Sequence, residues 1–245
     1  MTVTAPKGFR AAGVAAGLKS GGALDVALVV NDGPDATVAG VFTANRVKAA
    51  PVLWTQQVVR GGQVRAVLLN SGGANACTGS AGFQDTHTSA EQTAASLTDA
   101  SPRQFGAAEV AVCSTGLIGV RLPMDKLIPG IQAAVRGLSR DGGTNAAQAI
   151  MTTDTRPKTT VVTRDGWTVG GMAKGAGMLA PALATMLCVL TTDAVAGTEA
   201  LDAALREACR VTFDRIDSDG CLSTNDTVLL LASGASGVEP TQAEL

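Results

Sequence analysis

The sequence predicts an α+β fold, in which strands and helices share one hydrophobic core. Apolar runs of strand length and of helix length follow one another without the regular strand–helix–strand alternation of a parallel α/β fold. Hydrophobic residues make up 46% of the 245 residues and charged residues 16%, which is enough to bury a core in one large domain or two small ones. Only 3% of the residues are aromatic, so we expect a core of closely packed small aliphatic side chains.

The composition predicts a cytoplasmic protein that binds neither nucleic acid nor membrane. The net charge is −2, without the basic patch or the aromatic platform that nucleic-acid binding needs. The longest apolar run, 178–190, is too short to span a bilayer, and the N-terminus lacks the apolar segment of a signal peptide. The cysteines form no CxxC pair and are expected to be reduced, several of them in the core. They are Cys77, Cys113, Cys188, Cys209 and Cys221.

The first half of the chain predicts four strands and two helices. The sequence Asn31-Asp32-Gly33-Pro34 is typical of a turn and predicts a hairpin between the first two strands. Pro51 falls in the first turn of the first helix, where a proline is tolerated. The expected strands span 24–30, 38–43, 64–69 and 109–113, and the expected helices span about 49–59 and 83–97.

The second half predicts two further helices, a hairpin and two more strands. A helix at 124–138 is expected to be interrupted or kinked at Pro129, and Thr144 is expected to cap a short helix that ends at Ile150. The turn Arg164-Asp165-Gly166 joins the two strands of the hairpin. The expected hairpin strands span 159–163 and 167–172, the remaining strands 186–190 and 223–232, and the last helix 198–213.

Thr185 stands at the start of the apolar strand 186–190, after a loop that contains glycine and proline. A threonine hydroxyl becomes a competent nucleophile when a base lies beside it, and the threonine's own α-amine serves as that base when it is free. Such an amine has a pKa of about 8, so it accepts protons near neutral pH. In an intact chain this nitrogen is an amide, so the mechanism requires a cut before Thr185. On the pattern alone, a structural threonine at a strand end is the favoured interpretation, and the motifs below change this balance.

Three further sequence patterns argue against a phosphate site, a zinc site or catalytic triad, and a calcium site. The glycine-rich loop 70–79 lacks both G-x-G-x-x-G spacing and a GK[ST] ending, so it predicts positive φ at Gly72 and Gly73 rather than a phosphate site. The only histidine, His87, lies on a polar helix face, which is typical of a solvated side chain and argues against zinc and against a catalytic triad. The acidic residues of 214–226 lack the ligand order of a calcium loop.

Four motifs occur in one order along the chain: NSGGANACTG (70–79), CSTGLIG (113–119), MTTDTRPK (151–158) and KGAGMLAPALATML (174–187). Together they resemble the ornithine acetyltransferase family, also called glutamate N-acetyltransferase. The resemblance runs from PKGFRAAGVAAG near the start to STNDTVLLLASG near the end. It implies an αββα sandwich, in which two packed β-sheets are covered by helices on both sides, and this is the fold we expect.

The resemblance also implies the site residues. Thr185 matches the nucleophile of the family, and the chain is expected to cut itself between Ala184 and Thr185. Thr115 and Gly116 match the residues that form the family's oxyanion hole, which binds the negative charge that develops on a carbonyl oxygen. The residues that match substrate-binding positions are Thr152, Lys174 and Thr185.

The implied reaction is a two-step transfer of an acetyl group in arginine biosynthesis. After attack on the Ala184 carbonyl and hydrolysis, piece 1–184 (α) separates from the β piece that begins at Thr185 and runs to residue 245. Thr185 then takes the acetyl group from N2-acetylornithine and passes it to glutamate, without metal or organic cofactor. Some family members also accept acetyl-CoA, and the sequence is compatible with both donors. Two α and two β pieces are expected to assemble as a heterotetramer.

Two alternatives remain beside this interpretation. An aminopeptidase or amidase of related fold would use the same N-terminal nucleophile, but would pass the acyl group to water. Family members continue beyond the position of residue 245, so the fold is expected to be incomplete at its C-terminal end. An uncleaved, inactive fragment is therefore the third hypothesis.

Overall fold

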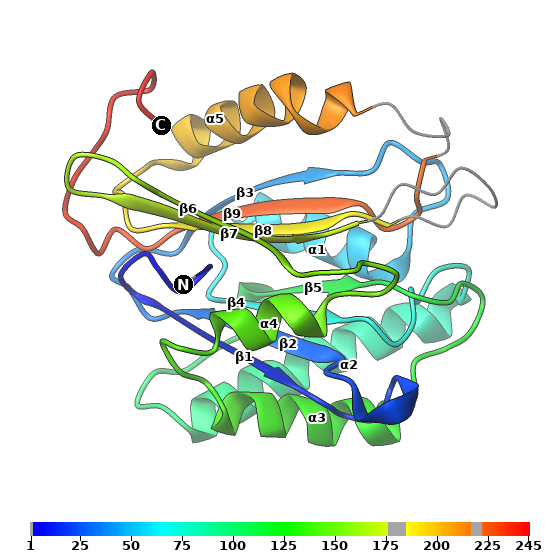
Figure 1. Ribbon diagram of the computed structural model, residues 1–245. Helices are drawn as coiled ribbons and strands as arrows, with labels where there is room; N and C mark the ends of the chain where they lie inside the picture. Colours follow the sequence, from blue (N-terminus) through cyan, green and yellow to red (C-terminus); the bar gives the residue numbers. More distant parts are fainter. Residues whose placement is uncertain (1, 176–184, 217–221) are drawn as a thin grey trace.

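The computed structural model describes residues 2–175, 185–216 and 222–245. Two β-sheets lie one above the other, with helices on the outer face of each (Figure 1). This arrangement confirms the α+β class and the expected αββα sandwich. Among the described residues, no helix is long and apolar enough to cross a membrane.

Sheet A, the lower sheet in Figure 1, contains four strands in the order β1-β2-β4-β5. Neighbouring strands are antiparallel except for the parallel pair β4 and β5. Both β2 and β4 are buried along their whole length, because helices cover one face of the sheet and sheet B covers the other. The strands are β1 (Phe9–Val14), β2 (Val26–Asn31), β4 (Ala66–Asn70) and β5 (Val110–Ser114).

Sheet B contains five strands in the order β3-β9-β8-β7-β6. The pair β8 and β9 is parallel and the other pairs are antiparallel. The predicted hairpin is confirmed as β6 and β7, which the Arg164–Trp167 turn joins. The strands are β3 (Thr37–Phe42), β9 (Thr227–Ala232), β8 (Leu187–Thr192), β7 (Thr168–Lys174) and β6 (Lys158–Thr163).

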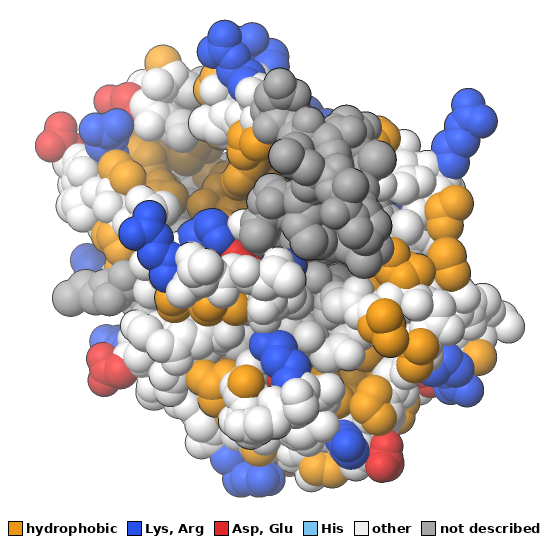
Figure 2. All heavy atoms as spheres, turned by 45° about the vertical axis from the view of Figure 1, so that its right-hand side comes forward, with side chains coloured by type: hydrophobic (Ala, Val, Ile, Leu, Met, Phe, Trp, Pro, Cys, Tyr) orange, Lys and Arg blue, Asp and Glu red, His pale blue; other side chains and the backbone are white. Residues whose placement is uncertain are grey.

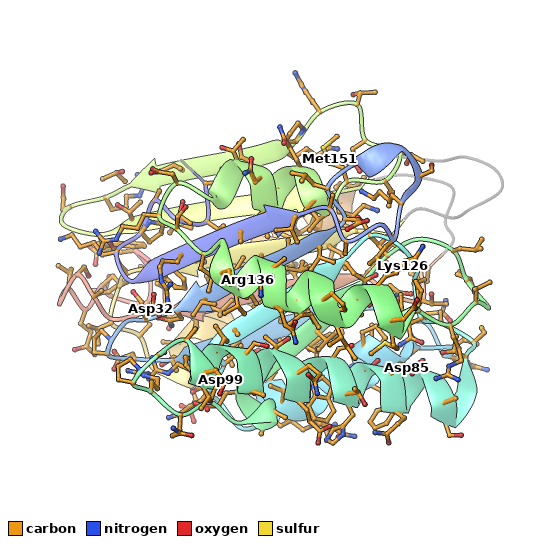
Figure 3. The ribbon with its side chains drawn as sticks, turned by 90° about the horizontal axis from the view of Figure 1, so that it is seen from below. Asp32, Asp85, Asp99, Lys126, Arg136 and Met151 are labelled. Atoms are coloured by element: carbon orange, nitrogen blue, oxygen red, sulfur yellow. The ribbon has the colours of Figure 1, made fainter. Side chains whose placement is uncertain are left out.

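The helices cover both outer faces and two edges of the sandwich. Helices α2 and α3 lie side by side below sheet A (Figures 1 and 3), α5 lies above sheet B, and α1 and α4 lie at opposite edges. The helices are α1 (Ala50–Arg60), α2 (Gly79–Asp99), α3 (Met124–Arg136), α4 (Gly143–Ala149) and α5 (Thr198–Val211), with short 3₁₀ turns at Ser20–Gly22, Ala107–Glu109 and Phe213–Arg215.

Side chains of α1 form hydrogen bonds with the backbone groups of β5 that face the open edge of sheet A. The indole nitrogen of Trp54 donates a hydrogen bond to the Val110 carbonyl, at 3.0 Å. The Thr55 hydroxyl donates to the Val112 carbonyl at 2.7 Å and accepts from the Val112 N–H at 2.9 Å. Because an unpaired edge strand can recruit other chains, these bonds close one side of sheet A.

The predicted hairpin between the first two strands is wrong. The turn Asn31 to Pro34 leads from β2 in sheet A to β3 in sheet B. The reason is the Asn31 amide, which donates to the Asp35 and Ala232 carbonyls at 3.1 and 3.2 Å. It therefore links the turn to the end of β9 and directs the chain into the other layer.

Most other elements are confirmed with shifted ends. The structure adds β1, which was not predicted because its small residues show no clear alternation. Helix α3 continues through Pro129, and α4 begins before Thr144, which is therefore not its cap. The last strand begins at Thr227 rather than Ser223, because the side chains of residues 223–226 bond to nearby groups instead of joining the sheet.

A cavity of about 360 Å³ lies between α5 and the outer face of sheet B. Figure 2 shows it as a hollow with hydrophobic walls at the upper left of that view. Its lining includes Met172, Cys188, Leu205 and Phe213. None of the predicted site residues that the structure describes, Thr115, Gly116, Thr152, Lys174 and Thr185, lines it.

Candidate active site

Thr185 lies two residues before β8, close to the strand start that the sequence predicts. Its side chain is nearly buried, with 7% of the residue exposed, and its Oγ1 lies 2.9 Å from the Oγ of Ser223. The Met186 N–H, one residue further on, donates to the Asp226 carboxylate at 2.8 Å. The loop before β9 therefore binds the side chain of Thr185 and the backbone of the residue that follows it. Ala184 lies outside the described residues.

Lys174 ends the neighbouring strand β7 and is paired with Leu187 of β8. It is only 3% exposed, and its Nζ donates a hydrogen bond to the Thr115 Oγ1 at 3.1 Å. Burial lowers the pKa of Lys174 to about 8, although Asp154 and Asp226 favour the charged form. The structure thus brings Lys174 and Thr115 together in one buried contact.

Thr115 and Gly116 form a turn at the end of β5. The Thr115 N–H donates to the Asn70 carbonyl at 3.0 Å, so this N–H is already used. Thr115 Oγ1 accepts from Lys174, which leaves the hydroxyl proton to donate. The Gly116 N–H meets no acceptor within the described part of the chain. Two neighbouring donors therefore remain, which is the kind of arrangement that stabilises a developing oxyanion.

Only glycine fits at position 116, because of the backbone conformation there and because of the atoms that lie close to it. Its φ of +131° lies in a region that side-chain-bearing residues avoid. A Cβ at this position would lie 2.9 Å from the backbone nitrogen of Gly73. The turn after β5 therefore packs directly against the glycine-rich loop that follows β4.

The glycine-rich loop differs from the prediction in its backbone. Positive φ occurs at Asn75, Cys77 and Gly79, and not at Gly72 or Gly73. Gly72 is needed for close packing instead, because a Cβ there would lie 2.2 Å from the Cβ of Leu18.

Asn225 joins the two sheets behind the site. Its buried side-chain amide donates to the Ala74 carbonyl at 2.7 Å and to the Ser114 carbonyl at 2.9 Å. These carbonyls belong to the loop after β4 and to the end of β5. Because Asn225 stands two residues before β9, it connects the site loop of sheet B to the Thr115 turn of sheet A.

Thr152 is exposed and lies in the loop between α4 and β6. Its N–H donates to the Asp154 carboxylate at 3.3 Å, and Gly175, next to Lys174, donates to the same carboxylate at 2.9 Å. Burial raises the pKa of Asp154, but bonds from the Lys158 ammonium and these two N–H groups outweigh it, so the pKa is lowered overall. Asp154 therefore links the Thr152 loop to the end of β7.

Within the described part of the chain, neither His87 nor any cysteine forms a hydrogen bond with Thr185. His87 packs edge-on against Trp54, with ring centroids 4.9 Å apart, and faces Glu91 at 3.6 Å. Cys113, Cys188 and Cys209 are buried free thiols, as expected, whereas Cys77 is exposed. Burial raises the pKa of both Cys113 and Cys188 to about 12. Of the acidic run 214–226, residues 217–221 lie outside the described residues.

Sequence reasoning missed three polar residues beside Thr185: Ser223, Asn225 and Asp226. All three fall within the expected last strand, and the acidic run that contains Asp226 suggested only a calcium loop, which its ligand order excludes. The available signal was the run Ser223 to Asp226 ahead of an apolar segment, because such residues favour local backbone bonds over a sheet ladder. Their contacts with Thr185 and Met186 span about 40 positions in sequence, which a pattern cannot reveal.

The fold defines a class of two-layered α+β sandwiches, and in this chain Thr185 precedes the middle strand of sheet B. The β-aminopeptidase from Burkholderia shares the fold, with a TM-score of 0.61 at 14% identity over 95% of this chain and 72% of that chain. The aminopeptidase and amidase from Ochrobactrum anthropi gives 0.56 at 14% identity over 95% and 73%.

Within this class, the chain belongs to the ArgJ family, whose model matches residues 10–245. It is 70% identical to the arginine biosynthesis bifunctional protein ArgJ of Streptomyces coelicolor over 98% of this chain and 61% of that protein. The ornithine acetyltransferase of Mycobacterium tuberculosis, solved with ornithine, is similar to it with 64% identity and a TM-score of 0.71 over 76% of this chain and 96% of that chain. The chain spans about 60% of the length of the curated relatives it matches.

Lys174 should make stability depend on pH. Its folded pKa of about 8 lies below its ordinary value of 10.5. Between these pH values the unfolded chain binds more protons, so the free energy of unfolding should rise with pH. We expect the difference in unfolding free energy between wild type and Lys174→Met to rise by about 2 kcal/mol from pH 7 to pH 10.

Denaturant titrations at each pH measure this difference. Lys126→Met is the matched control, because the Lys126 ammonium is exposed on α3 (Figure 3). The difference in unfolding free energy between wild type and Lys126→Met should stay constant from pH 7 to pH 10. A constant difference for Lys174→Met as well would contradict the buried position of its ammonium group.

Proposed function

We propose that this chain carries the catalytic threonine of a self-cleaving acetyltransferase of arginine biosynthesis, which moves an acetyl group from N2-acetylornithine to glutamate. The observation that carries the proposal is the buried contact of Lys174 with Thr115 beside the strand that Thr185 begins. Lys174 and Thr185 belong to neighbouring strand ends of sheet B and Thr115 follows β5 of sheet A, so a hydroxyl nucleophile, oxyanion donors and a cation are available where the two sheets meet. Family membership and the printed names of the relatives support the same activity.

Thr185 is the proposed nucleophile. Its hydroxyl is held by Ser223, and its backbone is anchored by the ladder of β8 from Leu187 onward. A nucleophile at the end of a rigid strand is positioned with little loss of entropy at the moment of reaction. Once the bond between Ala184 and Thr185 is cut, the freed α-amine would serve as its base.

The lengths of the solved relatives support a cut near Thr185. The Mycobacterium tuberculosis chain matches 76% of this chain over 96% of its own length, and the Bacillus halodurans ArgJ chain matches 76% over 95%. Since 76% of 245 residues is about 186 residues, and these make up 96% and 95% of the two solved chains, those chains are about 194 to 196 residues long, close to the 184 residues that precede Thr185. Pieces 1–184 and 185–245 are accordingly the proposed α piece and the start of the β piece.

The proposed oxyanion hole consists of Thr115 and Gly116. The Thr115 hydroxyl and the Gly116 N–H are the two donors that remain available in the turn. Lys174, in contact with Thr115, adds a positive charge in a site of low dielectric constant, which strengthens its effect on developing negative charge.

Substrate contacts are proposed for Lys174, Thr152 and Thr185. An ammonium group that burial has partly stripped of water suits the carboxylate of an amino acid. The solved relative is described as complexed with ornithine, which is consistent with such a substrate. Acetyl-CoA is a second proposed donor, and a heterotetramer of two α and two β pieces in the cytoplasm is the proposed assembly.

In the proposed reaction, Thr185 Oγ attacks the acetyl carbonyl of N2-acetylornithine and transfers its proton to the α-amine. The negative oxygen is held by Thr115 and Gly116 until ornithine leaves with the proton. The acetyl ester on Thr185 is then attacked by the glutamate amine. This is two-step covalent catalysis with ping-pong kinetics. A hydrolase of the same fold would differ only in the last step, where water replaces glutamate.

Thr185→Ala should abolish both cleavage and transfer. The intact mass under denaturing conditions should show two pieces for wild type, divided between Ala184 and Thr185, and one full-length chain for the variant. Thr185→Ser keeps a hydroxyl and should still cleave. A single full-length wild-type chain would contradict self-cleavage and favour the inactive fragment. Cleaved protein that releases acetate without forming N-acetylglutamate would favour the hydrolase.

Gly116→Ala should reduce the transfer rate about 100-fold, the usual effect of losing one oxyanion donor. The added Cβ would press against Gly73 and displace the turn. Gly119→Ala is the matched control, because Gly119 also has positive φ but no atom within 4 Å of an added Cβ. Steady-state rates of N-acetylglutamate formation measure both variants. Equal losses in the two would assign the effect to backbone strain rather than to the oxyanion turn.

A further inference from the structure

We propose that Asp154 is a positioning residue that holds the Thr152 loop and Lys174 in one geometry for substrate binding. The inference rests on the proposed function, in which Thr152 and Lys174 contact the substrate. It adds the residue that fixes these two groups relative to each other. Asp154 acts through them and is assigned no contact with the reacting atoms.

The Asp154 carboxylate joins separate segments of the chain. Its Oδ1 accepts the Gly175 N–H at 2.9 Å and also binds the Lys158 ammonium group. Its Oδ2 accepts the Thr152 N–H at 3.3 Å. Since Gly175 directly follows Lys174, the carboxylate bonds to the backbone of one proposed substrate residue and to the backbone beside the other.

The carboxylate is buried although its loop lies at the surface. The side chain of Asp154 is 0% exposed, whereas Thr152 is exposed. A buried carboxylate is costly unless it is paired and hydrogen-bonded, so the loop is stable where all the bonds to Asp154 form together. On the other side of Thr152, the carbonyl of Met151, labelled in Figure 3, accepts from the Lys19 ammonium at 2.7 Å. The loop is therefore held on both sides of Thr152.

Asp154 also acts on the charge of Lys174. Within the described residues, the carboxylates that favour the charged form of Lys174 belong to Asp154, before β6, and Asp226, before β9. The ammonium groups of Lys158 and Lys19 oppose them. Since burial already lowers the pKa of Lys174 to about 8, the loss of one carboxylate would leave less cation at neutral pH to bind the carboxylate of an amino acid.

Asp154→Asn removes the charge and one of the two acceptor oxygens while keeping the size of the side chain. It should raise KM for both N2-acetylornithine and glutamate at least about tenfold, the effect of losing a charged hydrogen-bonding group. The value of kcat should change less than KM, because the lost interaction serves binding rather than the chemical step. Steady-state rates of N-acetylglutamate formation measure both constants. Self-cleavage, followed by intact mass, should continue in the variant.

The titration of Lys174 is a readout that a purely structural role of Asp154 would not move. Denaturant titrations from pH 6 to pH 10 give the unfolding free energy of Asp154→Asn and of the double variant that also carries Lys174→Met. The difference between these two proteins should rise with pH, as the difference between wild type and Lys174→Met does. The rise should begin about one pH unit lower, because loss of an opposite charge lowers the pKa of a lysine.

Asp193→Asn is the matched control. The Asp193 carboxylate also accepts two backbone N–H groups, from Lys7 at 3.0 Å and from Thr168 at 2.7 Å. Thr168 begins β7, however, whereas Lys174 ends it. We expect Asp193→Asn to lose stability but to keep the wild-type KM values and the wild-type titration of Lys174.

A folded Asp154→Asn variant with wild-type KM values and an unshifted titration would overturn the positioning role and leave the proposed function intact. Equal rises of KM in Asp154→Asn and Asp193→Asn would assign the effect to lost stability and would also overturn it. Absence of N-acetylglutamate formation by wild type would overturn the proposed function. In that case a shifted titration would still support the action of Asp154 on Lys174, and an unshifted one would overturn it.

Discussion

The buried amide of Asn225 is the interaction on which the site depends. It binds one carbonyl from the loop after β4 and one from the end of β5, and so ties the loop before β9 in sheet B to sheet A. Removing it would leave both carbonyls unpaired in the interior, at a cost of about 1–3 kcal/mol each. Since Ser223 and Asp226 flank Asn225, the bond that joins the sheets also sets their distance from Thr185.

The chemistry follows from burial at this junction of the two sheets. Thr185, Lys174 and Thr115 are each less than 10% exposed, so water competes weakly for their hydrogen bonds. The same burial lowers the pKa of Lys174 and raises the pKa of Asp226. The Lys174 ammonium, bound to Thr115, and the Asp226 carboxylate, bound to the Met186 N–H, are therefore both part of the buried surroundings of Thr185.

Local patterns predicted most elements but not how the layers are connected. Apolar runs located β2, β4, β5 and β8, and the turn at Arg164 to Gly166 correctly joined β6 to β7. The turn at Asn31 to Pro34 looked the same in sequence, yet its chain crosses to the other sheet, because the Asn31 amide bonds to the end of β9. Thr115, Lys174 and Thr185 came from the family resemblance. Ser223 and Asp226 emerged only when folding brought distant segments together.

The central claim is that Thr185 carries the acetyl group. Incubating the protein with N-acetylornithine but without glutamate, then quenching with acid and digesting it, would locate any bound acetyl group by mass spectrometry. We expect an acetyl group on the peptide that begins at Thr185, and we expect this group to disappear when glutamate is added and to reappear as N-acetylglutamate. Formation of N-acetylglutamate with no acetyl group on that peptide would contradict it.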